Sequence, residues 1–138
     1  MTIAARPSVW LTAFNDAINN AGLPSGIGMK PTTGDGQPWV ILTVMSAVYD
    51  GDIELYNSDK DATVQVRSVG LSPEQASAAA DRADDAVFSV TQFDGGKVVF
   101  RTRDTMTNPV RDDATFPGRS VFYVDAMYRV WLSPSLSE

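Results

Sequence analysis

Five carboxylates lie close together in one acidic stretch of the sequence, and they are the side chains most suited to metal binding or catalysis. They are Asp50, Asp52, Glu54, Asp59 and Asp61. Several carboxylate oxygens at short spacing are the ligands that Ca²⁺ and Mg²⁺ prefer. The spacing departs from an EF-hand loop, which alternates its ligands and requires a glycine and a final glutamate at fixed positions. We therefore expect a solvated or partner-facing loop and no metal site, and Tyr49 and Tyr56 beside the acids favour a partner, because aromatic residues are enriched in interface cores.

Two missing residue types restrict the remaining chemistry. The chain has no histidine and no cysteine, which excludes Ser-His-Asp and Cys-His catalysis, disulfides and thiolate metal sites. Its glycines also lack the spacing of a phosphate-binding loop. A carboxylate-based, metal-dependent enzyme stays as an alternative. Because no spacing of the acids favours it, we expect no catalytic residue and no cofactor.

The charge balance points away from nucleic-acid binding. The chain carries 11 basic and 17 acidic residues, a net charge of −6, whereas nucleic-acid binders present a basic surface. No segment has the apolar length of a membrane span or of a signal peptide. We therefore expect a protein that is made and kept in a cytoplasm, without a membrane and without a specific grip on DNA.

A second charged cluster surrounds the connection between the last two predicted strands. Both signs are interspersed in it, as on an ordinary solvated surface, although such charges could also form ion pairs between subunits and set their register. Its members are Arg101, Arg103, Asp104, Arg111, Asp112, Asp113 and Arg119.

The first predicted helix covers residues 8–21, where apolar residues recur at helical spacing. Gly22 and Pro24 end it. Residues 22–38 hold five glycines and three prolines, which predicts a surface loop without regular structure.

The second predicted helix has a strong start signal. Ser72 is suited to the N-cap and Pro73 to the first helical position, while Gln75 is placed to return a capping-box hydrogen bond. The helix runs to about Val90, and alanine dominates its inward stripe, so that its axis can lie close to a sheet.

Alternating or continuous apolar patterns predict four strands. They cover residues 39–45, 62–69, 97–103 and 121–132. Residues 46–61 are acidic and rich in turn formers, so we expect a long antiparallel hairpin or an extended loop there. Residues 104–118 are expected to form a charged, proline-bearing connection. Residues 133–138 are expected to form a loose tail.

The order of the elements is helix, strand, strand, helix, strand, strand. At 138 residues the chain has the size of one domain, residues 1–138. We predict an α+β fold, with a mainly antiparallel four-stranded sheet and two helices packed on one face.

This arrangement leaves the second face of the sheet unexplained. Residues 39–45 and 121–132 carry large apolar side chains on both faces, and large apolar patches are uncommon on monomers. Either neighbouring subunits bury the second face or its edge, or loops of the same chain fold over it. Under the first alternative, the subunit-interface candidates are Trp39, Arg82, Asp85, Tyr123, Arg129 and Trp131.

Two segments carry a resemblance to a known family. They are VQVRSVGLSPEQASAAADRADDAVF, residues 64–88, and SVFYVDAMYRVWLSPS, residues 120–135. Through them the chain resembles the tail terminator, or tail completion, proteins of long-tailed noncontractile bacteriophages, in particular the actinobacteriophage branch. The resemblance spans about residues 40–135 and is one of patterns rather than of invariant residues.

The resemblance implies a structural virion protein of the tail or neck, assembled in the host cytoplasm. It would form a homohexameric ring that caps the head-proximal end of the tail tube, stops tube polymerisation and docks to the head-closure ring. Its partners would be other copies of itself, the tail tube protein and the head-closure or neck protein, with DNA passing through the lumen without specific binding. A head-closure or other neck connector protein is the alternative within phage.

No single residue is carried over from the family. Charge and expected exposure instead select the candidates that would face the neighbouring rings. These partner-interface candidates are Tyr49, Asp50, Asp52, Glu54, Tyr56, Arg103, Asp104, Arg111, Asp112, Asp113 and Arg119.

Overall fold

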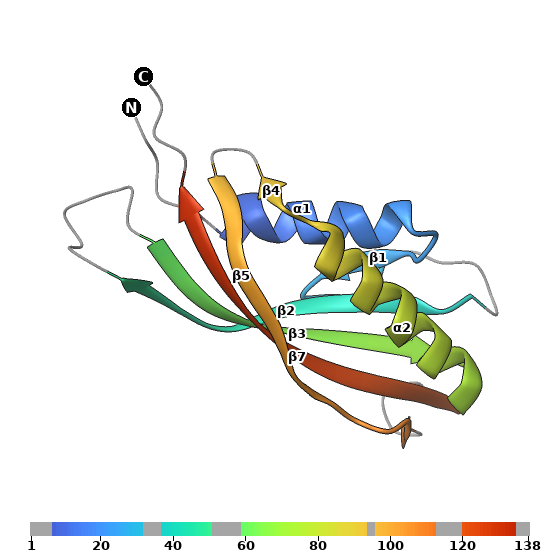
Figure 1. Cartoon of the computed structure of the whole chain (residues 1–138). Coiled ribbons are helices and arrows are strands. Elements are labelled where there is room, and N and C mark those ends of the chain that lie inside the picture. Colours follow the sequence, from blue (N-terminus) through green and yellow to red (C-terminus); the bar gives the residue numbers. More distant parts are fainter. Residues whose placement is uncertain (1–6, 32–36, 51–58, 94–95, 113–119, 135–138) are drawn as a thin grey trace.

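The computed structural model describes residues 7–31, 37–50, 59–93, 96–112 and 120–134 (Figure 1). Two helices and seven strands follow one another along the chain. They are α1 Pro7–Asn20, β1 Ser25–Ile27, β2 Trp39–Asp50, β3 Asp59–Gly70, α2 Pro73–Ser89, β4 Gln92–Phe93, β5 Gly96–Met106, β6 Val110–Asp112 and β7 Val121–Pro134.

The strands form one mixed sheet in the order β1-β2-β3-β7-β5-β4, and β6 also pairs with β7. β1 lies parallel to β2, whereas β2–β3, β3–β7, β5–β7, β4–β5 and β6–β7 are antiparallel. The predicted four-stranded antiparallel sheet is therefore wrong. The sheet has three more strands, and it is curled, with the helices lying in its hollow rather than on a flat face (Figure 1).

The three additional strands are two or three residues long, and two of them, β1 and β6, lie where the sequence predicted loops. Such short segments carry no usable alternation, and they become strands only because a longer strand lies beside them. β1 shows how this happens. Asn15 and Asn19 of α1 bind Ser25: the Ser25 hydroxyl donates to Asn15 Oδ1 at 2.7 Å, and Asn19 Oδ1 accepts from the Ser25 amide at 3.2 Å. Helix α1 thereby fixes β1 against β2.

The four predicted strands are present and longer than predicted. The largest extensions are in β2 and β3, which pair from Trp39 opposite Val69 out to Asp50 opposite Asp59, with a bulge after Val44. Of the two alternatives predicted for the acidic stretch, a long hairpin or an extended loop, the described part shows the hairpin. Its tip, residues 51–58, lies outside the described residues.

The core fills the hollow of the curled sheet. Trp10, Phe14 and Ile18 of α1 share one buried cluster with the alanine stripe of α2 and with inward residues of the central strands. The alanines let α2 approach the sheet closely, as predicted. The strand members of this cluster include Val40, Leu42, Val64, Val66, Ala126, Tyr128, Val130 and Leu132.

The start of α2 follows its sequence signal with one change. Ser72 is the N-cap, and its hydroxyl accepts a hydrogen bond from the Gln75 amide at 3.1 Å. The Gln75 side chain reaches back one residue further than a capping box requires, because its Oε1 accepts from the Leu71 amide at 2.6 Å. Two backbone donors are satisfied in either case.

We predict that Ser72→Ala lowers the free energy of unfolding by about 1 kcal/mol, since it removes the acceptor for an amide at the helix start. Denaturant unfolding followed by tryptophan fluorescence measures the loss. Ser72→Asp is the control, because aspartate also caps helices. A Ser72→Asp variant as unstable as Ser72→Ala would contradict a capping role.

Candidate interaction surface

One end of the outer sheet face, opposite the helices, is covered by the chain itself. Trp39, Val69 and Val121 form a second buried cluster there, against which Ile41 and Tyr123 pack. Trp39 is only 1% exposed, and Lys30 Nζ lies 4.5 Å from the centre of its ring. Trp39, a predicted subunit-interface residue, is therefore buried by its own chain in this structure.

The middle of the outer face is polar. Arg67 donates two hydrogen bonds to the carboxylate of Asp125, at 2.8 and 2.9 Å, and its guanidinium carbon lies 4.2 Å from the centre of the Tyr123 ring. The hydrogen bonds to Asp125 raise the pKa of Arg67. Tyr123, a predicted subunit-interface residue, is half-buried beneath this pair.

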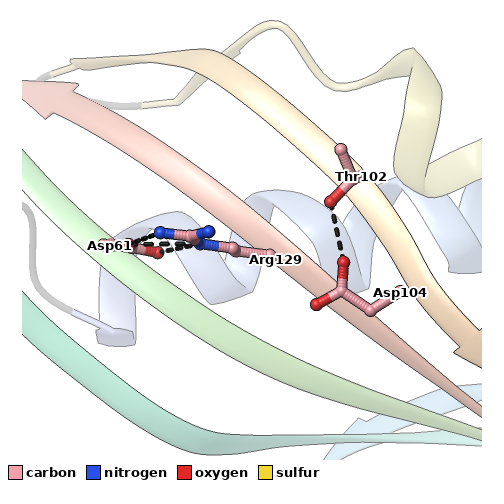
Figure 2. Close-up of polar contacts among 4 residues, drawn as sticks. All are labelled: Asp61, Thr102, Asp104 and Arg129. Atoms are coloured by element: carbon pink, nitrogen blue, oxygen red, sulfur yellow. Dashed lines mark hydrogen bonds and ion pairs between the residues drawn. The ribbon is translucent and has the colours of Figure 1, made fainter.

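The far end of the outer face carries a second ion pair. Arg129 of β7 reaches across to Asp61 of β3, with a shortest contact of 2.6 Å between Arg129 Nη2 and Asp61 Oδ2 (Figure 2). Hydrogen bonding to Arg129 lowers the pKa of Asp61, against the smaller opposing effect of burial. Asp61 was a candidate metal ligand and Arg129 a candidate interface residue, and the structure brings these two together within one chain.

The ion pair of Asp61 should make the stability of the fold depend on pH in the acid range. Because its pKa is lower in the folded than in the unfolded state, its contribution to stability is present above the unfolded value near 3.8 and is lost as the pH falls through the folded value. The difference in melting temperature between wild type and Asp61→Asn should therefore shrink between pH 6 and pH 3. Asp81→Asn, on the exposed side of α2, is the control. A difference that does not change with pH would contradict this ion pair.

The described members of the second charged cluster do not share one surface. Arg103 faces α2, with its Nη1 3.0 Å from Asp84 Oδ2, and Arg101 donates to the carbonyl of Val90 at the end of α2. Burial lowers the pKa of Arg101. On the same strand, the Thr102 hydroxyl donates to Asp104 Oδ1 at 3.0 Å (Figure 2).

The remaining members of that cluster lie further along the chain. Arg111 of β6 is exposed, and its Nη2 donates to the Ser120 hydroxyl at 3.0 Å. Asp112, the last residue of β6, is half-buried and pairs with Val121. Asp113 and Arg119 lie outside the described residues.

A polar network links β7, α2 and β5 inside the hollow of the sheet. The hydroxyl of buried Tyr128 donates to Asp84 Oδ1 at 2.6 Å, and Asp84 also pairs with Arg103. Burial, and then the hydrogen bond to Asp84, raise the pKa of Tyr128. The phenol therefore stays protonated and acts as a donor that ties α2 to the sheet.

The acidic stretch is only partly described. Tyr49 and Asp50 end β2, and Asp59 begins β3, whereas Asp52, Glu54 and Tyr56 lie outside the described residues. In the described part of the chain, no three carboxylates gather closely enough to hold a metal ion.

Two further candidates, Arg82 and Asp85, line an open hollow of about 500 Å³ between α1 and α2. Both side chains are exposed, and Arg82 donates to the Ala21 carbonyl at the end of α1. The internal cavity lined by Phe14, Leu42 and Tyr128 measures only about 10 Å³. Its other lining residues are aliphatic, so it is too small and too apolar for a ligand.

Sequence patterns missed three strongly exposed apolar side chains of the sheet. Val99 and Phe100 of β5 are 54% and 53% exposed, and Met45 of β2 is 54% exposed. Met45 and Val99 lie at the β-bulges after Val44 and Val98, which interrupt the alternation that sequence patterns rely on. Phe100 is paired with Trp131 of β7. Trp131, the remaining predicted subunit-interface residue, is half-buried.

Neither a protein-family model nor a curated protein matches this chain. Among the described helices, neither is long and apolar enough to span a membrane.

Proposed function

We propose that this chain is a ring-forming tail terminator of a long-tailed phage, which caps the head-proximal end of the tail tube and docks to the neck. One observation carries the proposal. The domain completes its own core around α1 and α2, yet it leaves long stretches of β2 and β5 without a neighbouring strand among the described residues. Such edges are templates for pairing with another chain.

Three further observations support an assembling protein. Large exposed apolar side chains lie on these same two strands, at Met45, Val99 and Phe100. The Tyr128 hydroxyl binds Asp84 and holds α2 against the sheet. Its raised pKa keeps it protonated, so it serves a structural role rather than acid–base chemistry. The β2–β3 hairpin extends well past the helices and can reach an adjacent ring (Figure 1).

Tube capping in vitro tests the proposal. Purified protein is added to tail tube protein that is polymerising, and tube lengths are measured by negative-stain electron microscopy. We expect tubes to stop growing and to carry a terminal ring. The variant Tyr49→Ser/Tyr56→Ser, in the predicted partner-binding stretch, should fold normally but cap poorly, whereas Thr12→Ser, on the exposed side of α1, should cap as wild type. Tubes that grow at the same rate with and without the protein would refute the proposal.

A further inference from the structure

Each of the two edges of the sheet is covered by a short strand over only part of its length. β4 pairs with β5 at Lys97 and Gly96, and the Val98 amide donates to the Thr91 carbonyl at 2.9 Å. Beyond Val98, no described strand lies on the side of β5 that faces away from β7. β5 continues for eight more residues to Met106, so most of its outer edge is open within the described chain.

The opposite edge has the same form. β1 covers β2 only at residues 40–42, and the Gly28 amide donates to the Leu42 carbonyl at 2.8 Å. From Thr43 to Asp50, β2 pairs with β3 alone among the described strands. The two open edges therefore lie at opposite sides of one sheet.

The directions of these strands are compatible with pairing between copies. β2–β3, β3–β7 and β7–β5 are each antiparallel, so β5 runs antiparallel to β2. If a second copy continues the sheet in the same orientation, its β2 meets β5 of the first copy as an ordinary antiparallel pair.

The two open edges distinguish this contact from a two-fold contact. Pairing β5 with β5 of another copy would leave residues 43–50 of β2 without a neighbouring strand on that side among the described residues, and unpaired edges are templates for further association. Pairing β5 with β2 instead covers both open edges of every copy. Charge does not oppose it, because Arg101 and Arg103 bind Val90 and Asp84 in their own chain, and residues 43–50 of β2 carry a single charged residue, Asp50.

We infer that copies of this chain join head to tail, with the open edge of β5 in one copy paired to the open edge of β2 in the next. The exposed Phe100 and Val99 of one copy then meet the exposed Met45 of its neighbour. Each copy uses one edge of each kind, and such a heterologous contact closes into a ring when its rotation closes. The inference rests on the proposed ring and names the contact that builds it.

Disulfide trapping tests this contact, because the chain contains no cysteine of its own. F100C or T102C on β5 is combined with T43C or M45C on β2, which covers the neighbouring registers of an antiparallel pair. Within one copy, β3 and β7 separate the two strands by three spacings, about 14 Å, which is too far for a disulfide. Any crosslink must therefore join different copies.

We expect at least one double variant to give, on oxidation of the full-length protein, a ladder of covalent multimers that ends at the ring size and collapses on reduction. Each single variant should stay monomeric on the same gel. The matched control is F100C with T12C, since Thr12 is exposed on α1 and lies on neither open edge. A covalent dimer of F100C alone would indicate a two-fold contact and overturn the inference. Double variants that crosslink no more than the control would overturn it as well.

The outcome separates the contact from the proposed function. A ladder from a protein that fails to cap tail tubes would support the contact and refute the terminator role. Capping by a protein whose variants give no ladder would support the role and refute the contact.

Discussion

Replacing Asp84 with alanine is expected to lower the free energy of unfolding by about 3 kcal/mol, mainly because its carboxylate accepts a hydrogen bond from a buried hydroxyl. It accepts from the hydroxyl of buried Tyr128 at 2.6 Å, and hydrogen bonds to charged groups are the stronger kind. Its removal also leaves that hydroxyl buried without its acceptor. The pair with Arg103 adds little, since the Arg103 side chain is 42% exposed and screened by water.

Tyr128→Phe is the matched control. It deletes the same hydrogen bond but leaves no buried donor, and Asp84 keeps Arg103 and some contact with water, so we expect a loss of only about 1 kcal/mol. Chemical denaturation of both variants, compared by their midpoints at equal slope, measures the difference. Equal losses for Asp84→Ala and Tyr128→Phe would show that the buried hydroxyl finds another acceptor and that the network is not what holds α2.

Gly70→Val is expected to destabilise the fold by about 3 kcal/mol, at the upper end of the range for overpacking. Gly70 ends β3, with only Leu71 and Ser72 between it and α2, and a Cβ there would lie 2.7 Å from the Ala76 amide nitrogen and 2.9 Å from the Gln75 carbonyl carbon. Both are backbone atoms of the first turn of α2, so they can move only if the helix moves away from the sheet.

Gly28→Ala provides the comparison for Gly70. Its added Cβ meets nothing within 4 Å, and its only penalty comes from a φ of +73°, about 1 kcal/mol. Thermal unfolding of Gly70→Ala, Gly70→Val and Gly28→Ala ranks the three variants by their loss of stability. If Gly70→Val were no less stable than Gly28→Ala, the close approach of α2 to β3 would not be a constraint on the fold.

The elements that the sequence predicted well are those with strong local signals. α1 was predicted within one residue at each end because its apolar spacing is regular and Gly22 follows it, and α2 because Ser72 and Pro73 mark its start. β1, β4 and β6 could not be predicted, since they depend on a neighbouring strand rather than on their own sequence. These short strands changed the predicted sheet from four antiparallel strands to a mixed, curled one.

Much less of the candidate surface could be predicted. Trp39 is a large aromatic residue of the kind enriched in interfaces, but packing against Val69 and Val121 buries it within the chain. In the sequence, Arg103 and Arg129 have the pattern of unpaired surface charges. In the structure, Arg103 pairs with Asp84 and Arg129 pairs with Asp61, each on an element distant in sequence. Exposure at Phe100 likewise depends on which strands lie beside β5, and a single strand's pattern does not contain that information.

The most direct test of the central claim is the distribution of tail lengths in lysates of a phage that lacks this gene, measured by negative-stain electron microscopy. A tail terminator predicts overlong tubes without heads, and normal tails when the wild-type gene is supplied in trans. Tails of normal length beside unattached heads would contradict termination and assign the protein to the neck, and normal infectious particles would contradict both roles.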